Sequence, residues 1–268
     1  MSVTETTERR LSRTGVDALA VKPAECDVSR ALDVDVDAVT VDYEGREHVP
    51  DASVLRELAE AKTLRVTTPV RATGFDPTGD ASVDDALPAE AGRVLVAGHG
   101  AYLDDDEQSR SVADRLGAAV AKHPDAWVGT ESVERVALAT GATQFELLSR
   151  STLREVRALR AAGFDGEVAV YAPTVLTDDE DAVLDAVGAY AARRGPVRRA
   201  LPDPEDGRES VATDASATGR ARDVLSKAVR DYALVGDVAT VRERVEALHD
   251  VGVDHVVAYP ARGIEHVN

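Results

Sequence analysis

Eight short apolar runs, separated by segments with helical periodicity, constrain the fold of this chain more than any other feature. Most runs are rich in Val, Ala and Leu and do not alternate with polar residues, as in parallel strands that are covered on both faces. The runs are residues 16–21, 38–43, 64–70, 94–98, 126–129, 144–148, 167–172 and 255–259. Alternating strands and helices with eight strands predict a closed (β/α)8 TIM barrel, with an open doubly wound sheet as the alternative.

The last unit of this pattern, residues 235–262, shows a helix followed directly by a strand. Asp237 is placed to cap the helix, because its carboxylate can accept hydrogen bonds from free backbone N–H groups. Val238, Val241, Val245 and Leu248 recur on one helical face, and Gly252 is expected to end the helix. Two further helix starts are expected as capping boxes, Thr152 with Glu155 and Thr177 with Glu180.

The length of 268 residues suits one barrel domain, which needs roughly 250 residues. We expect a flexible N-terminus at residues 1–12, then a single barrel domain over residues 13–268. Within it, residues 195–219 are rich in Pro, Ser, Thr, Ala and Gly and are expected to form a long loop. No apolar stretch approaches about 18 residues, so no membrane partner is expected. The first ten residues lack the apolar core of a signal peptide, so a cytoplasmic location is expected.

The formal net charge is −18, and only Lys22, Lys62, Lys122 and Lys227 among the basic residues are lysines. The acidic residues are spread along the whole chain. This acidic composition predicts a halophilic protein, whose surface repulsion is screened at high salt. It also argues against a nucleic-acid partner, which requires a concentrated basic face. The single Cys26 excludes an internal disulfide.

Candidate site residues stand where the predicted strands end, because barrel active sites lie at the carboxyl ends of the strands. These ends carry Lys22, Asp42, Thr67, Thr68, Tyr171 and Tyr259. His99 lies between Gly98 and Gly100, which allow close backbone approach to a ligand. A plain turn histidine is the alternative. No metal site is expected, because no second histidine or carboxylate stands at metal-ligand spacing.

The segment from Gly129 to Ser132 runs from a predicted strand into a predicted helix start. Free N–H groups at a helix N-terminus suit a phosphate, and Thr130 and Ser132 add hydroxyl donors. Glu131 opposes this reading, since its charge would repel a phosphate and satisfy the helix dipole itself. The alternative is a helix capped by its own Ser and Glu.

An ordered series of segments resembles the luciferase-like barrel superfamily, and most nearly its deazaflavin-dependent methylenetetrahydromethanopterin reductases. V-G-D-V-A-T-V-R-E-R-V-E-A-L-H-D-V-G-V-D-H-V-V-A-Y-P resembles the closing helix and strand of that family. A-W-V-G-T-E-S-V-E-R-V-A-L-A-T-G-A resembles its strand and small-residue loop. E-V-A-V-Y-A-P-T-V-L-T-D-D-E-D-A-V is similar to its penultimate strand, and A-G-R-V-L-V-A-G-H-G to its G-x-G loop.

The resemblance implies a luciferase-like oxidoreductase that transfers a hydride between a deazaflavin or FMN cofactor and a small-molecule substrate. It places His99 and Asp42 near the cofactor ring as catalytic groups. It places the cofactor against Thr67, Thr68, Gly98, Gly129 and Thr130, with Thr130 and Ser132 holding the phosphate. It also implies a cis peptide in the third strand, expected at Thr67-Thr68, and a possible homodimer. The substrate itself is not predicted.

Two other functions remain open from the sequence. The first is a barrel without catalysis that serves as a binding or structural subunit, which Glu131 and the few aromatic residues at the strand ends favour. The second is an aldolase-like enzyme in which Lys22 forms a Schiff base, which needs an ammonium of lowered pKa in an apolar pocket.

Overall fold

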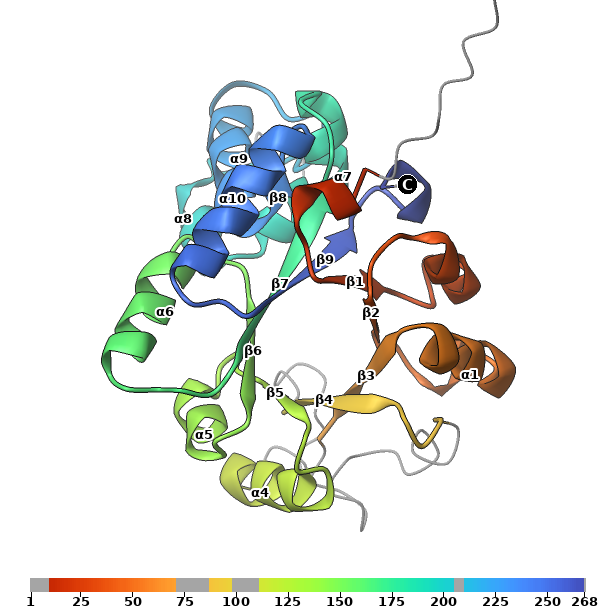
Figure 1. Ribbon diagram of the computed structural model, residues 1–268. Helices are drawn as coiled ribbons and strands as arrows, with labels where there is room; N and C mark the ends of the chain where they lie inside the picture. Colours follow the sequence, from red (N-terminus) through yellow and green to blue (C-terminus); the bar gives the residue numbers. More distant parts are fainter. Residues whose placement is uncertain (1–9, 71–86, 98–110, 205–209, 268) are drawn as a thin grey trace, which may run out of the picture.

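The computed structural model describes residues 10–70, 87–97, 111–204 and 210–267. Eight parallel strands follow one another around a closed barrel, and β6 pairs with β7 to complete the ring (Figure 1). The predicted (β/α)8 barrel is therefore confirmed, and the open sheet is excluded. The barrel strands are β1 (Ala18–Val21), β2 (Ala38–Val41), β3 (Thr63–Pro69), β4 (Gly92–Val96), β5 (Trp127–Gly129), β6 (Thr143–Leu147), β7 (Val168–Val175) and β9 (His255–Pro260).

Each predicted apolar run overlaps one barrel strand, because its residues contact helices on one face and the barrel interior on the other. In β1, Leu19 and Val21 join the outer core, whereas Ala18 and Ala20 line the interior. One strand was not predicted from the sequence. This strand, β8 (Leu234–Val235), has two residues and pairs with Thr174 and Val175 of β7 beyond the point where β6 ends.

Helices surround the barrel (Figure 1) and bury their apolar faces against the outward side chains of the strands. Leu55 and Leu58 of the first helix and Val241, Val245 and Leu248 of the last one belong to the same outer core. The surrounding helices are α1 (Ala52–Ala61), α4 (Val112–Lys122), α5 (Glu134–Ala139), α6 (Thr152–Ala161) and α10 (Val238–Asp250).

The ends of the last surrounding helix agree with the sequence. The Asp237 carboxylate accepts a hydrogen bond from the Thr240 amide at 2.8 Å. Gly252 follows the helix with φ = 101°, a conformation that favours glycine.

The two predicted capping boxes are wrong. Before the helix α7 (Glu180–Ala192), Asp179 is the cap, and its carboxylate accepts hydrogen bonds from the amides of Asp181 and Ala182. The Thr177 hydroxyl instead accepts the Asp179 amide at 3.2 Å. Thr152 lies inside its helix, and its hydroxyl accepts the Ser149 amide at 2.9 Å. Local hydroxyl-to-backbone bonds compete with the expected caps.

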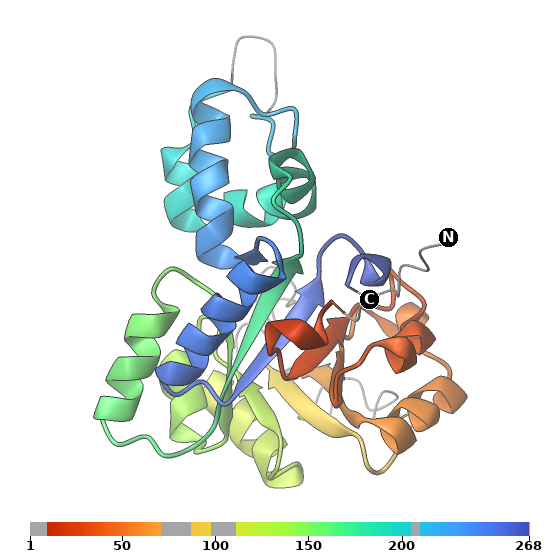
Figure 2. The same cartoon turned by 45° about the horizontal axis from the view of Figure 1, so that its top comes forward.

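A three-helix extension stands on the carboxyl end of β7, above the barrel (Figure 2). It consists of α7, α8 (Gly195–Ala200) and α9 (Gly219–Tyr232), which share an apolar core of their own. The loop expected at residues 195–219 is thus helical over its first six residues. The segment after it packs closely on α7, since a Cβ at Gly188 would lie 1.9 Å from the Thr213 carbonyl oxygen.

Aromatic rings form a column inside the barrel. Trp127 and Phe145 have ring centroids 5.9 Å apart, and Phe145 meets Tyr171 edge-on at 5.9 Å. Tyr171 stacks on Tyr259 at 6.1 Å with an interplanar angle of 14°. Small side chains, such as Ala20, fill the remaining interior. The interior is therefore a packed core, and its upper rings reach the carboxyl end of the barrel, here called the mouth.

Candidate functional site

The central pair at the mouth is Asp42 and Tyr171, which come from opposite parts of the chain. Asp42 directly follows β2, and Tyr171 points inward from β7. The Tyr171 hydroxyl donates a hydrogen bond to Asp42 Oδ2 at 3.1 Å. Burial raises the pKa of Asp42 to about 7, and the Tyr171 hydrogen bond and the Lys22 charge only partly offset this rise. A carboxyl group with this pKa can both release and take up a proton near neutral pH.

Tyr171 itself stays protonated. Burial raises the pKa of its hydroxyl well above the usual range, and the neighbouring Asp42 and Tyr259 raise it further. Its role is therefore to hold the carboxyl group of Asp42, because a neutral hydroxyl donates a hydrogen bond without adding charge.

Next to this pair, Lys22 lies over the Tyr259 ring, with its Nζ 4.3 Å from the ring centroid. The same nitrogen is 3.3 Å from Glu25 Oε1, and the Tyr259 hydroxyl donates to the other oxygen of that carboxylate. Burial and the Glu25 hydrogen bond raise the pKa of Tyr259. The Lys22 ammonium thus lies between a carboxylate and an aromatic ring face, not in the apolar pocket that a Schiff-base lysine needs.

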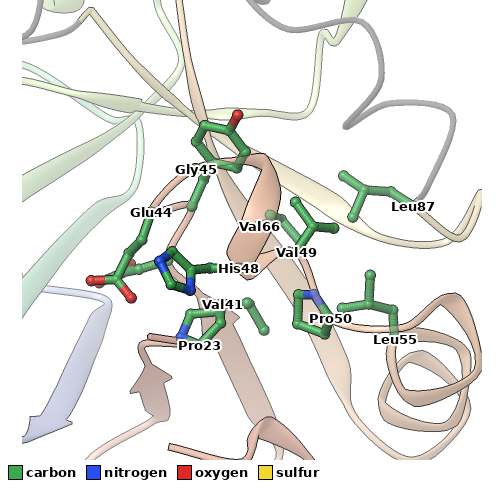
Figure 3. A pocket seen from close by; sticks show the side chains of 12 residues that line it. Pro23, Val41, Glu44, Gly45, His48, Val49, Pro50, Leu55, Val66 and Leu87 are labelled. Atoms are coloured by element: carbon green, nitrogen blue, oxygen red, sulfur yellow. The ribbon is translucent and has the colours of Figure 1, made fainter. Parts of the chain in front are cut away.

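A small cavity lies beside Asp42, between the ends of β2 and β3 and the helix α1 (Figure 3). His48, Pro50 and Leu55 are among the side chains that line it. Its volume of about 10 Å³ is close to the minimum that one water molecule needs. The cavity is therefore too small to hold a cofactor ring.

The structure separates the two threonines at the end of β3. Arg65 lies against the interior ring of Trp127, so strand alternation directs Thr67 inward and Thr68 outward. Thr67 Oγ1 accepts a hydrogen bond from the Tyr43 amide at 2.7 Å. Thr68 is 1% exposed, and its hydroxyl donates to the Val66 carbonyl at 3.4 Å. Only Thr67 thus faces the interior. The expected cis peptide is also wrong, since every peptide bond of the described residues is trans.

The residues expected to hold a phosphate are engaged elsewhere. The Thr130 amide donates to the Phe145 carbonyl at 3.0 Å, as part of the sheet. A Cβ at Gly129 would lie 3.0 Å from Val96 Cγ1, so this glycine gives room to the neighbouring strand. Ser132 is exposed at φ = 65°, and the helix α5 begins only at Glu134. Gly98 and His99 lie outside the described residues.

At the rim of the mouth, the extension contacts the loop after β5. Arg194 Nη1 lies 3.5 Å from Glu131 Oε1, and Nη2 donates to the Tyr190 hydroxyl. The guanidinium also lies over the Tyr190 ring, 4.4 Å from its centroid. We call Glu131, Tyr190 and Arg194 the rim cluster. The sequence singled out only Glu131, as a charge that opposes phosphate binding, because the contacts of Tyr190 and Arg194 depend on how the extension packs.

The match that defines the family spans nearly all of the described barrel. A family of unknown function matches residues 11–267. The chain belongs to this family, DUF7388. A search of curated protein sequences finds no match. Among the described residues of this DUF7388 protein, no helix is both long and apolar enough to cross a membrane.

Two solved structures are similar in fold to the DUF7388 chain. An F420-dependent secondary alcohol dehydrogenase in complex with an F420-acetone adduct is similar over 91% of this chain and 92% of its own, with a TM-score of 0.56 and 13% identity. The monooxygenase RslO1 from Streptomyces bottropensis is 15% identical and has a TM-score of 0.49, with 93% of this chain and 94% of its own covered. At 13% identity, the dehydrogenase establishes the barrel fold alone.

Proposed function

We propose that this protein is a luciferase-like oxidoreductase that acts on a small molecule at the barrel mouth. The observation that carries the proposal is the partly buried Asp42 carboxyl, which is held by the Tyr171 hydroxyl and whose pKa desolvation raises to about 7. Interconversion of an alcohol and a carbonyl compound moves a proton as well as a hydride. A group whose pKa lies near the working pH is best suited to move that proton. The barrel shared with a dehydrogenase supports the same class.

The residues of the chain have separate roles in this proposal. Asp42 takes up or releases the proton at its carboxyl oxygen. Tyr171 is a positioning residue, because its hydroxyl holds Asp42 Oδ2 at 3.1 Å. The stacked rings of Tyr171 and Tyr259 close the interior below the mouth. They thereby limit the access of water from inside the barrel, which keeps the carboxyl desolvated.

We propose deazaflavin or FMN as the cofactor class, which would supply the hydride chemistry when bound. The predicted phosphate residues do not fit this role. The Thr130 amide is used in the sheet, and the six-residue helix α5 begins with an acidic residue. Glu131 adds a further negative charge beside them. The phosphate contacts must therefore come from other residues, and we assign no reaction step to the cofactor.

A binding or structural barrel without catalysis is the second candidate. The same absence of a phosphate site at Thr130 and Ser132 favours it. The Schiff-base alternative has no support in the geometry, since Lys22 contacts Glu25 and the Tyr259 ring.

Cofactor titration at high salt separates the first two candidates. Deazaflavin and FMN are added to the purified protein while cofactor fluorescence is followed. We expect at least one of them to bind at micromolar concentration. If neither binds, the oxidoreductase proposal fails and the non-catalytic barrel is favoured.

Substitution of Asp42 then tests the assigned proton transfer. Reduced cofactor is assayed against a panel of small aldehydes and ketones, and oxidised cofactor against small alcohols. We expect Asp42→Asn to lower kcat/KM by about 10²- to 10⁴-fold and to leave cofactor affinity unchanged. Glu167→Gln, which alters an exposed carboxylate at the other end of the barrel, is the control. Equal activity of Asp42→Asn and wild type would remove Asp42 from the mechanism.

A further inference from the structure

Arg194 is a partly buried cation at the rim of the mouth. Its side chain is only 22% exposed, whereas the neighbouring arginines Arg193, Arg198 and Arg199 are exposed. Such a position is uncommon for a charge in a chain of net charge −18. A guanidinium in a partly buried position is suited to bidentate recognition of a carboxylate or a phosphate.

The internal partners of Arg194 use only part of its hydrogen-bonding capacity. Nη2 donates to the neutral Tyr190 hydroxyl, and Nη1 reaches Glu131 Oε1 only at 3.5 Å. Within the described residues, the buried Nε–H has no acceptor. A buried donor without an acceptor is destabilising. The guanidinium is thus held in place by the Tyr190 and Tyr232 rings but is poorly satisfied by its anion.

Glu131 is a weak and replaceable partner. Its side chain is 54% exposed, and the ion pair is at the outer limit of a hydrogen bond. Exposed ion pairs of this kind contribute little to stability. The Glu131 carboxylate can therefore move into solvent at little cost when another oxyanion approaches Arg194.

The rim cluster also lies beside the proposed reaction centre. Glu131 follows Thr130 directly after the carboxyl end of β5, where the Thr130 amide still pairs with β6. Through its contact with Glu131, Arg194 is therefore held at the same end of the barrel as the Asp42–Tyr171 pair.

We propose that Arg194, with the Tyr190 hydroxyl, recognises an oxyanion group, a carboxylate or a phosphate, of the ligand that binds at the mouth. The Glu131 carboxylate occupies the place of this group in the free protein and leaves when the ligand binds. Arg194 is thus a specificity-determining residue. The inference relies on the proposed function only for the mouth as the ligand site, and it holds for either hydride transfer or simple binding.

Binding of inorganic phosphate tests the proposal without cofactor or turnover. Isothermal titration is performed at constant ionic strength, with KCl replaced by potassium phosphate. We expect Glu131→Gln to bind phosphate several-fold more tightly than wild type, since the internal competitor is removed. In the Glu131→Gln background, Arg194→Gln should weaken binding at least about tenfold, because a charge-assisted pair is lost. Arg198→Gln is the matched control, because it removes the same charge from an exposed position of the helix α8, which directly follows Arg194.

Two results overturn the inference. One is the absence of phosphate binding to Glu131→Gln. The other is equal weakening by Arg194→Gln and Arg198→Gln, which indicates general charge attraction. Circular dichroism of each variant confirms folding, and Arg194→Lys repeats the test with the charge retained. Lysine cannot reproduce the bidentate geometry, so intermediate binding is expected.

A second titration identifies the source of the oxyanion group. FMN and riboflavin differ only in the phosphate. If the group belongs to the cofactor, Arg194→Gln weakens FMN and leaves riboflavin unchanged. If it belongs to the substrate, FMN and riboflavin respond alike, and a short carboxylate such as butyrate shows the dependence on Arg194. If phosphate binds as expected but turnover does not depend on Asp42, the proposed function is rejected and this binding site is not.

Discussion

At the amino-terminal end of the barrel, the guanidinium of Arg65 lies 3.9 Å from the centre of the Trp127 ring. At the mouth, the partly buried carboxyl of Asp42 is instead held by the uncharged Tyr171 hydroxyl. Burial lowers the pKa of Arg65, while the nearby Glu167 carboxylate opposes that change. His255 stacks on Trp127 at 5.0 Å and contacts Glu167 at 3.4 Å. The lower end balances its charges, whereas the mouth leaves a carboxyl free to titrate.

This difference in charge balance indicates that the two ends of the aromatic column make different contributions. The lower end closes the barrel with rings and compensated charges, so its contribution is to stability. At the mouth, the Lys22 charge only partly offsets the desolvation of the Asp42 carboxyl, which costs stability and, in the proposed function, suits the carboxyl to proton transfer. Substitutions at each end should therefore affect different measurements.

Trp127→Ala should produce the largest effect, at the lower end. Trp127 is 2% exposed and contacts Phe145, His255 and Arg65, so its removal leaves a large cavity. We expect the free energy of unfolding to fall by about 3–5 kcal/mol. Urea unfolding followed by far-UV circular dichroism measures it, with the partly exposed Leu153→Ala as control. A loss below about 1 kcal/mol would show that the lower end is not the stabilising end.

Ionisation of Asp42, at the mouth, should change the stability by an intermediate amount. The pKa of Asp42 is about 7 in the folded state and about 3.9 in the unfolded state. Between these values the folded state binds the proton and the unfolded state does not. The Asp42 contribution to stability therefore falls as pH rises from about 4 to 7, by on the order of a few kcal/mol, and is constant above 7.

Asp42→Asn removes this dependence. The stability difference between Asp42→Asn and wild type should grow from pH 5 to pH 7 and then level off. Urea titrations at pH 5, 6, 7 and 8 and constant salt measure it. Parallel curves for the two proteins across this range would contradict an elevated pKa for Asp42.

Glu167→Gln should have the smallest effect, again at the lower end. The Glu167 side chain is 57% exposed, and exposed ion pairs contribute little. We expect the free energy of unfolding to change by less than about 1 kcal/mol. Urea unfolding, as for Trp127→Ala, measures this change. A larger loss of stability would mean that the charge balance at the lower end depends on this single contact.

The barrel could be predicted because its signal is repeated. Eight apolar runs each carry the pattern of a strand that is buried on two faces, and errors of a few residues at their ends do not change the architecture. The strand β8 has two residues, which is too short for any periodicity to appear. The helix α8 contains a proline and two arginines and has a single buried side chain, Val197. Its formation depends on packing within the extension, which composition does not reveal.

The site could be predicted only in part. Strand ends identify Asp42 and Tyr171 as residues of the mouth, but their hydrogen bond joins positions 129 residues apart. That contact depends on closure of the barrel. The phosphate prediction at Thr130 rested on a strand that leads into a helix. Whether the Thr130 amide is free is decided by the register of β5 with β6, in which Gly129 lies opposite Phe145.

The position of β8 has a consequence for how such a protein can diversify. The chain leaves the barrel after Val175 and returns at Leu234, and these two segments are hydrogen-bonded neighbours. The helices between them are thus attached to the barrel at a single place. Replacement of these helices by another sequence would leave the pairing of β7 with β9 intact. Evolution can rebuild the side of the mouth that carries Tyr190 and Arg194 while it inherits Asp42 and Tyr171 unchanged. The residues proposed for ligand choice and those proposed for proton transfer can therefore change independently of one another.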